Sequence, residues 1–230
     1  MQMGTEIFHN LKKVLHDRHL STAVGDEGGF APNLKSNTEA IEVVLKSIEA
    51  AGYRPGEDIF IAMDAASTEL YDESTGKYVF KKSTGDSLTS SQMVDFWKDW
   101  VSKYPIVSIE DPAGQDEFAT LAKINAQIGH QVQIIGDDVL VTNAERIVRA
   151  SEAAACNAVL IKVNQAGTVT EAKAALDAGK ARGWGTIVSA RSGESEDVTI
   201  AHLSVGWDAG QLKVGSFTRS ERMAKWNEVL

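Results

Sequence analysis

Charged side chains follow six short apolar segments of the sequence, each at the point where the segment ends. Three carboxylates come first and three cations follow, in the order Asp64, Glu110, Asp137, Lys162, Arg191 and Lys213. Most of their separations are close to the roughly 31 residues expected when about 250 residues build eight strand-helix units. Because parallel sheets and barrels collect active-site residues at the carboxyl ends of their strands, we expect these charges to meet at one mouth.

The three carboxylates predict a site for a divalent cation. Asp64, Glu110 and Asp137 would repel one another strongly if they converged with no cation among them. Their oxygens are hard ligands, and no histidine or cysteine lies near them in the sequence, which favours Mg²⁺. A single acidic residue after a strand more often caps a helix or supports a turn, and we assign that role to the adjacent Asp111 and Asp138.

The three cations are suited to an anionic substrate. Arg191 can hold a phosphate or a carboxylate through two parallel hydrogen bonds. Lys162 or Lys213 can carry out proton chemistry if its pKa is lowered. None of the five histidines follows a strand-like segment, so a lysine base is favoured over a histidine base.

The segments that precede these charges are typical of buried β-strands. They are continuous apolar runs rich in β-branched residues, as in strands covered on both faces, at 59–63, 106–109, 132–135, 158–161, 186–188 and 212–214. Amphipathic stretches alternate with them, a polar insertion lies around 72–85, and two helices at 6–20 and 38–51 precede the first strand. The alternation predicts an α/β fold built on a parallel sheet in one compact unit.

Four capping boxes mark expected helix starts. In each, a serine or threonine is followed three residues later by glutamate or glutamine, so that the two residues satisfy each other's free backbone N–H groups. The pairs are Ser36 with Glu39, Thr89 with Gln92, Thr142 with Glu145, and Thr168 with Glu171.

The composition excludes several classes of protein. The chain has 230 residues, 43% of them hydrophobic and 24% charged, which is ordinary globular composition without an apolar run long enough to span a membrane. The formal net charge of −9 disfavours a nucleic-acid partner. The single cysteine, Cys156, cannot form an intrachain disulfide and is expected to be a buried, inert thiol, which fits a reducing compartment and predicts a cytoplasmic protein.

Six motifs, in order along the chain, resemble the successive signatures of the enolase family. They are GDEGGFAPN at 25–33, SIEDP at 108–112, GDD at 136–138, IKVNQ at 161–165, RSGE at 191–194 and RSER at 219–222. The resemblance covers essentially the whole chain. It implies the Mg²⁺-dependent reversible dehydration of 2-phosphoglycerate to phosphoenolpyruvate in glycolysis, by a protein that forms a homodimer or a larger assembly.

The resemblance also implies a role for each matching residue. Asp64, Glu110 and Asp137 would bind Mg²⁺, and Lys162 would be the base that removes the carbon-bound proton of the substrate. Glu27 would be the acid that assists the loss of hydroxide. In addition to Lys162, the substrate would contact the matching polar side chains Arg191, Ser192 and Lys213, the first two at the phosphate and Lys213 near the carboxylate end.

The sequence departs from the family at two places. Ala190 stands where the family has a histidine, which removes a donor near the substrate and predicts weakened catalysis or phosphate binding. The resemblance further implies an N-terminal α+β domain followed by an eight-stranded barrel, whereas this chain supplies six barrel strands and two preceding helices. We therefore expect residues 1–230 to form an incomplete enolase-type TIM barrel, without the N-terminal domain and the first two strands, whose open sheet edges favour association.

Three alternative functions stay open at this point. One is a non-catalytic enolase-like protein with a binding or structural role, and another is an inactive fragment of an enolase. A third is a dehydratase or racemase of the wider superfamily, against which the GDEGG and RSGE motifs argue.

Overall fold

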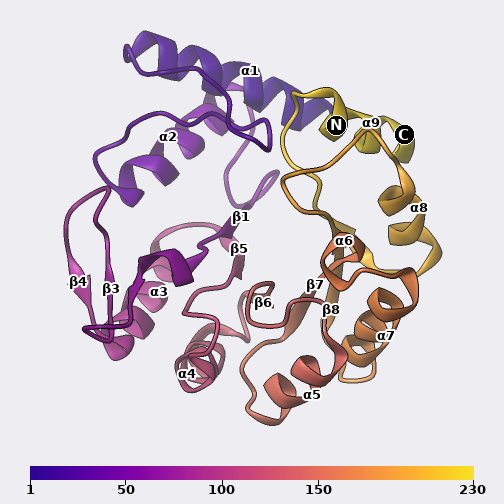
Figure 1. The fold of residues 1–230 in the computed structure, drawn as a ribbon. Coiled ribbons are helices and arrows are strands. Elements are labelled where there is room, and N and C mark those ends of the chain that lie inside the picture. Colours follow the sequence, from indigo (N-terminus) through magenta and orange to yellow (C-terminus); the bar gives the residue numbers. More distant parts are fainter.

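A six-stranded parallel sheet forms the centre of the molecule. The computed structural model describes residues 1–230. The strands lie in the order β1-β5-β6-β7-β8-β9, with every neighbouring pair parallel. Their bounds are β1 Ile61–Asp64, β5 Ile106–Glu110, β6 Gln133–Gly136, β7 Ala158–Lys162, β8 Gly185–Ser189 and β9 Gly210–Leu212. Figure 1 shows the sheet curled inside a ring of helices.

The helices lie outside the sheet and connect its strands. They are α1 Gln2–Asp17, α2 Asn37–Ala50, α3 Ser90–Lys103, α4 Phe118–Ile128, α5 Ala144–Glu152, α6 Val163–Ala166, α7 Val169–Lys180, α8 Thr199–Gly206 and α9 Ser220–Val229. The two ends of the chain lie near each other (Figure 1), and the ring of Phe217 packs so closely on Gly4 that a Cβ there would lie 2.2 Å from it. No helix combines the length and the apolar character that crossing a membrane requires.

Alternate residues of the strands enter two separate apolar clusters. Ile161 and Val188 belong to a large cluster that includes the buried faces of the helices. Leu160 and Ile187 belong to a small cluster, which lies inside the curl of the sheet because successive side chains point to opposite faces. Both faces of the strands are therefore covered by apolar side chains, as the continuous apolar runs predict.

Three of the four expected helix caps are present. Ser36, Thr89 and Thr168 are N-caps whose side chains each accept the backbone N–H three residues on, and Thr89 with Gln92 completes the reciprocal capping box. The prediction at Thr142 is wrong. Asn143 caps α5 instead, and accepts the N–H of Arg146 at 3.0 Å. Thr142 itself has a φ of 52°, outside the extended region that an N-cap normally adopts.

The polar insertion forms a small antiparallel sheet that was not predicted from the sequence. After the 3-10 turn η1 (Ser67–Leu70), its strands are β2 Tyr71–Asp72, β3 Lys77–Val79 and β4 Ser87–Leu88. The rings of Tyr71 and Tyr78 pack with their centroids 5.0 Å apart. The Tyr78 hydroxyl accepts the N–H of Gly114 at 2.9 Å, which fastens the insertion to the loop after β5.

The architecture agrees with the expected incomplete barrel. The curled sheet has six strands, and its outer strands β1 and β9 each pair with one neighbour only. All five connections between consecutive strands of this sheet place the carboxyl ends of the strands at the same mouth, because the strands are parallel.

Candidate active site

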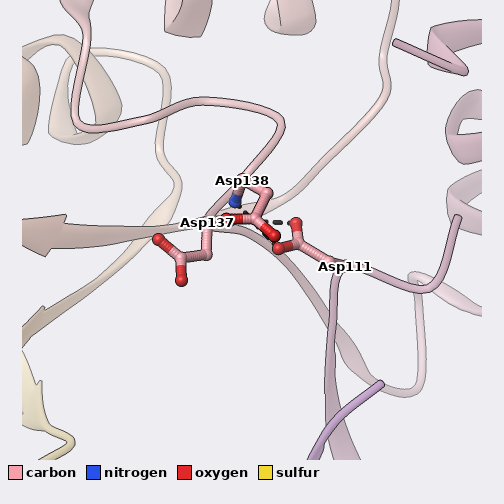
Figure 2. Close-up of side chains that lie close together, drawn as sticks. All are labelled: Asp111, Asp137 and Asp138. Carbon is pink, nitrogen blue, oxygen red and sulfur yellow. Dashed lines mark hydrogen bonds between the residues drawn. The ribbon is translucent and has the colours of Figure 1, made fainter. Parts of the chain in front are cut away.

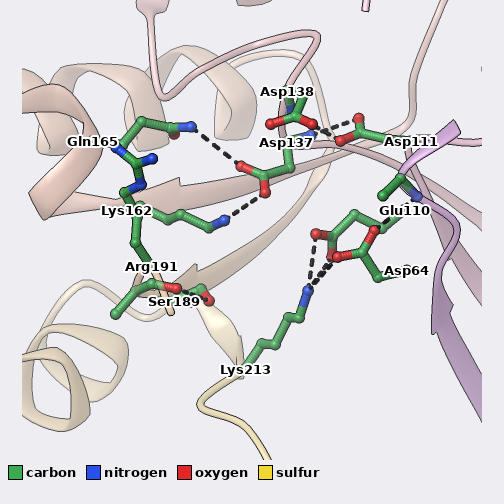
Figure 3. Close-up of polar contacts among 12 residues, drawn as sticks. Asp64, Glu110, Asp111, Asp137, Asp138, Lys162, Gln165, Ser189, Arg191 and Lys213 are labelled. Carbon is green, nitrogen blue, oxygen red and sulfur yellow. Dashed lines mark hydrogen bonds and ion pairs between the residues drawn. The ribbon is translucent and has the colours of Figure 1, made fainter. Parts of the chain in front are cut away.

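Each of the six strands delivers a polar side chain to the mouth of the sheet (Figure 3). Asp64 ends β1 and lies in register with Glu110 at the end of β5. Lys162 ends β7 and lies in register with Ser189 at the end of β8. Asp137 directly follows β6, and Lys213 directly follows β9. The predicted convergence of acidic and basic groups is therefore present, with the carboxylates on one side of the mouth and the lysines on the other.

Lys213 joins the two open edges of the sheet. Its Nζ donates to both carboxylate oxygens of Glu110, at 2.9 and 3.0 Å, and to Oδ2 of Asp64 at 3.1 Å. Burial opposes the charged form of Lys213, but the negative charges of Glu110 and Asp64 outweigh burial and raise the pKa of its ammonium group. Lys213 therefore stays protonated and acts as a fixed positive charge at the mouth.

Glu110 is the most buried of the three carboxylates that were predicted to bind metal. It is 3% exposed. Burial raises its pKa, Lys213 opposes this effect, and repulsion from Asp64 and Asp137 adds to it. A carboxylate under this repulsion is stabilised by an additional cation. The set Asp64, Glu110 and Asp137 consists only of hard oxygen donors, a chemistry that suits Mg²⁺. These three residues are not, however, among the groups whose ligand oxygens all lie within 4.8 Å of one another.

Asp137 faces the lysine on the neighbouring strand. Lys162 Nζ donates to Oδ2 of Asp137 at 2.5 Å, and the two side chains are 13% and 8% exposed. Gln165, on the short helix α6, donates from Nε2 to Oδ1 of Asp137 at 3.4 Å. Each oxygen of the Asp137 carboxylate therefore has its own donor (Figure 3). Sequence reasoning noted Gln165 only as part of the IKVNQ motif and assigned it no role.

Asp137 also belongs to a second cluster of carboxylates. Asp111, Asp137 and Asp138 each place a carboxylate oxygen within 4.8 Å of the others, close enough to hold a metal ion (Figure 2). The oxygens of Asp111, however, accept the backbone N–H groups of Asp137 and Asp138 at 3.0 and 2.8 Å. Burial raises the pKa of Asp111 to about 7, although these hydrogen bonds oppose the shift. The contacts fit the supporting role expected for Asp111.

Glu27 reaches the mouth from the glycine-rich loop between α1 and α2. Its Oε1 accepts the hydroxyl of Ser192 at 2.9 Å. Gly28 has a φ of 80°, and a Cβ there would lie 2.7 Å from the carbonyl oxygen of Thr218, so only glycine fits this close approach. The Thr218 hydroxyl in turn donates to the Gly28 carbonyl at 2.7 Å. The loop is thereby held against the segment that follows β9.

The structure places Arg191 at the rim with an exposed side chain. Its backbone N–H donates to Oδ1 of Asn164 at 3.3 Å, which ties the end of β8 to α6. An exposed guanidinium beside Ser192 is free to bind an anion with two parallel hydrogen bonds. Ala190, immediately before it, is buried at 8% exposure and belongs to the large apolar cluster.

Two buried cations of α9 donate hydrogen bonds to backbone carbonyls of the loops of the site. Arg222 and Lys225 are each only 1% exposed. Arg222 donates to the carbonyl of Ser192, to that of Asp26 at 3.4 Å and to that of Val214 at 3.4 Å. Each acceptor lies next to, or belongs to, a predicted site residue. Sequence reasoning missed this function of Arg222, because nothing in the RSER motif shows what the arginine contacts.

A sequence model of one protein family, described as "Enolase, C-terminal TIM barrel domain", matches residues 1–230. The match covers the six strands and all the side chains at the mouth, and it agrees with the incomplete barrel seen in the structure.

Proposed function

Because the chain belongs to the enolase C-terminal TIM barrel family, we propose that it catalyses the Mg²⁺-dependent, reversible dehydration of 2-phosphoglycerate to phosphoenolpyruvate. One observation carries the proposal. Three carboxylates and two lysines, Asp64, Glu110, Asp137, Lys162 and Lys213, meet at the carboxyl ends of five strands. Such a mouth suits a substrate with a carboxylate and a phosphate, because cations bind its charges while a base removes a proton between them.

The metal would be held by Asp64, Glu110 and Asp137. When bound, Mg²⁺ supplies positive charge against the carboxylate oxygens of the substrate, where negative charge develops as the neighbouring carbon loses its proton.

Lys162 is the better candidate for the base. Lys213 is bonded to two carboxylates, Glu110 and Asp64, which hold it protonated, whereas Lys162 has the single carboxylate partner Asp137. Lys162 Nζ, as a neutral amine, would take the proton from the substrate carbon, and Asp137 would stabilise the ammonium group that results. The two lysines are therefore assigned different tasks, Lys162 for the proton transfer and Lys213 for fixed charge near the substrate carboxylate.

Glu27 and the rim complete the proposal. Glu27 would give a proton to the departing hydroxide from its carboxyl group, which the Ser192 hydroxyl orients. Arg191 and Ser192 would bind the phosphate, Arg191 through its exposed guanidinium. We place this reaction in glycolysis and the cytoplasm, and expect a homodimer or larger assembly, which light scattering on the purified chain would detect.

The test follows product formation and metal binding separately. The purified chain is mixed with 2-phosphoglycerate and Mg²⁺, the ultraviolet absorbance of the enol phosphate is recorded, and Mg²⁺ affinity is measured by calorimetry. We expect Lys162→Met to lower turnover by at least about 100-fold. Lys173→Met is the matched control, because Lys173 lies on the outer surface of α7 in an ion pair with Asp177, and its turnover should equal that of the unchanged chain.

Three results would contradict the catalytic proposal. Equal turnover in Lys162→Met and the unchanged chain would remove Lys162 as the base. Mg²⁺ binding without turnover would favour a non-catalytic enolase-like binding protein. The absence of both turnover and Mg²⁺ binding would favour an inactive fragment.

A further inference from the structure

Thr142 lies in an unusual conformation between β6 and α5. It is buried at 3% exposure, and its φ of 52° follows a φ of 45° at Val141. Two consecutive β-branched residues in the left-handed region are strained, because their branched Cβ crowds the backbone there. Such strain persists only where the surrounding contacts hold it in place, and it concentrates at functional positions.

The contacts that hold Thr142 are two hydrogen bonds of its hydroxyl. Oγ1 accepts the backbone N–H of Lys162 at 2.9 Å. The same hydroxyl donates its single proton to Oε1 of Gln165 at 2.7 Å. The threonine therefore connects the end of β7 with the first turn after it, instead of capping α5.

The bond between the Thr142 hydroxyl and Gln165, together with Asp137, settles the orientation of the Gln165 amide. The carboxylate of Asp137 only accepts hydrogen bonds, so it requires the NH₂ side of the amide, and Nε2 lies 3.4 Å from its Oδ1. The carbonyl side then faces Thr142, whose hydroxyl supplies the matching proton. Each side of the Gln165 amide therefore faces a partner of the matching type: the NH₂ group faces an acceptor, and the carbonyl oxygen faces a donor.

A closed ring of polar contacts results. Thr142 bonds to the backbone of Lys162 and to the side chain of Gln165, and both of these residues donate to the carboxylate of Asp137. Because one oxygen of Asp137 is bonded to Lys162 and the other to Gln165, the carboxylate cannot rotate freely. Loss of the Thr142 hydroxyl would release the amide of Gln165 and with it one of these two constraints.

We propose that Thr142 is a positioning residue of the site: its hydroxyl fixes the amide of Gln165 and thereby the carboxylate plane of Asp137 beside Lys162. The expected effect on catalysis rests on the proposed function, whereas the restraint of the Gln165 amide by Thr142 does not depend on that function. Thr142 touches neither substrate nor metal in this proposal, and acts only through Gln165.

Two substitutions of Thr142 separate the effect of its hydroxyl from the effect of its side-chain shape. Thr142→Val keeps the branched Cβ and the backbone strain but removes the hydroxyl, and Thr142→Ser keeps the hydroxyl without the methyl group. Gln165→Met removes the amide alone and provides a second route if Thr142→Val fails to fold. Thr186→Val is the control, because Thr186 is equally buried and donates to the carbonyl of Ala209, away from Asp137.

The first measurement is independent of activity. In ¹⁵N-edited spectra, the Gln165 side-chain amide protons, assigned by their loss in Gln165→Met, should exchange slowly with solvent in the unchanged chain, in Thr142→Ser and in Thr186→Val. They should exchange rapidly in Thr142→Val. Slow exchange in Thr142→Val, or rapid exchange in Thr142→Ser, would overturn the proposal, whatever the chain does with 2-phosphoglycerate.

The second measurement concerns the metal and the reaction. Thr142→Val should weaken Mg²⁺ affinity by about 10-fold and lower kcat by a similar factor, with little change in the KM for substrate. Thr142→Ser should restore both, and Thr142→Val combined with Gln165→Met should be no worse than either change alone. Independent, additive effects would overturn the link through Gln165. If the unchanged chain has no turnover, the proposed function fails while the exchange and Mg²⁺ results still decide this inference.

Discussion

Replacing Arg222 by methionine tests how the loops of the mouth are held. The guanidinium is buried on α9 and donates to the carbonyl groups of Ser192, Asp26 and Val214. Methionine fills a similar volume but has no donor, so all three carbonyl groups lose this partner. The substitution should therefore destabilise the loops that carry Glu27 and Ser192 as well as the protein as a whole.

The magnitude follows from the three contacts. A hydrogen bond from a charged donor contributes roughly 1.5–3 kcal/mol, and the bond to Ser192 is the short one of the set. The two contacts at 3.4 Å are long and together add about 1 kcal/mol. Two effects reduce this loss, because the substitution removes two unfavourable features of Arg222. Its Nε is buried without a hydrogen-bond partner. Its charge also repels the buried Lys225, whose pKa is lowered first by burial and further by Arg222. We expect a net loss of about 3 kcal/mol in the free energy of unfolding.

Denaturant unfolding and hydrogen exchange measure the two effects. For a chain of this length, about 3 kcal/mol corresponds to a fall of roughly 6–12 °C in Tm. Amide exchange should accelerate in residues 25–30 and 192–195, while the loop at 114–117, fastened by Tyr78, stays unchanged. Arg54→Met is the control, because the Arg54 side chain is 66% exposed in surface ion pairs that contribute less than about 1 kcal/mol. If Arg222→Met behaves like Arg54→Met in both assays, the buried contacts do not hold the loops.

Three further predictions concern single side chains. Burial raises the pKa of the Tyr78 phenol to about 12. The folded state therefore holds this proton more tightly than the unfolded chain does. The stability that results is present below about pH 10, and roughly 2 kcal/mol of it is lost as the pH rises to about 12. The difference in unfolding free energy between the unchanged chain and Tyr78→Phe should shrink over that range, and a constant difference would refute the assignment. Cys156 is 2% exposed and burial raises the pKa of its thiol, so iodoacetamide should modify it only after unfolding; rapid alkylation of the folded chain would contradict this. Ala190→His should raise turnover by restoring a donor beside Arg191, and turnover at or below that of the unchanged chain would count against the proposed cost of alanine there.

The strands of the central sheet could be predicted because their burial on both faces leaves a simple pattern. Continuous apolar runs locate all six strands within a few residues, and the charge that ends each run marks the mouth. The small sheet β2-β3-β4 could not be predicted, since strands of two or three residues have no measurable periodicity. Its position depends on the packing of Tyr71 on Tyr78 and on the hydrogen bond to Gly114, which are tertiary contacts.

The residue types at the mouth could be predicted, but not their pairing. Lys213 contacts Asp64 across 149 positions of sequence, and Ser192 contacts Glu27 across 165. These pairs depend on how strongly the sheet curls, which no local pattern encodes. Thr142 shows the same limit at short range. Its spacing to Glu145 matches a capping box, yet the neighbouring Asn143, an equally good or better cap, takes that position and leaves the threonine to bond to β7.

The mouth of the sheet is held together by the same polar groups that would carry out the chemistry. Apolar packing covers the bodies of the strands, and at the mouth Lys213, which follows the edge strand β9, bonds to Asp64 on the other edge strand β1 and to Glu110 on β5. A neutral side chain in place of Lys213 would therefore have two effects at once: it would remove this contact between the two edges and leave the buried Glu110 with less compensating charge. Since a buried carboxylate without a partner is costly, charge balance at the mouth contributes to the fold as well as to the proposed reaction. Substitutions there should be judged by both stability and turnover, and the roles of Lys162 and Lys213 can be separated only when the two are measured on the same variant.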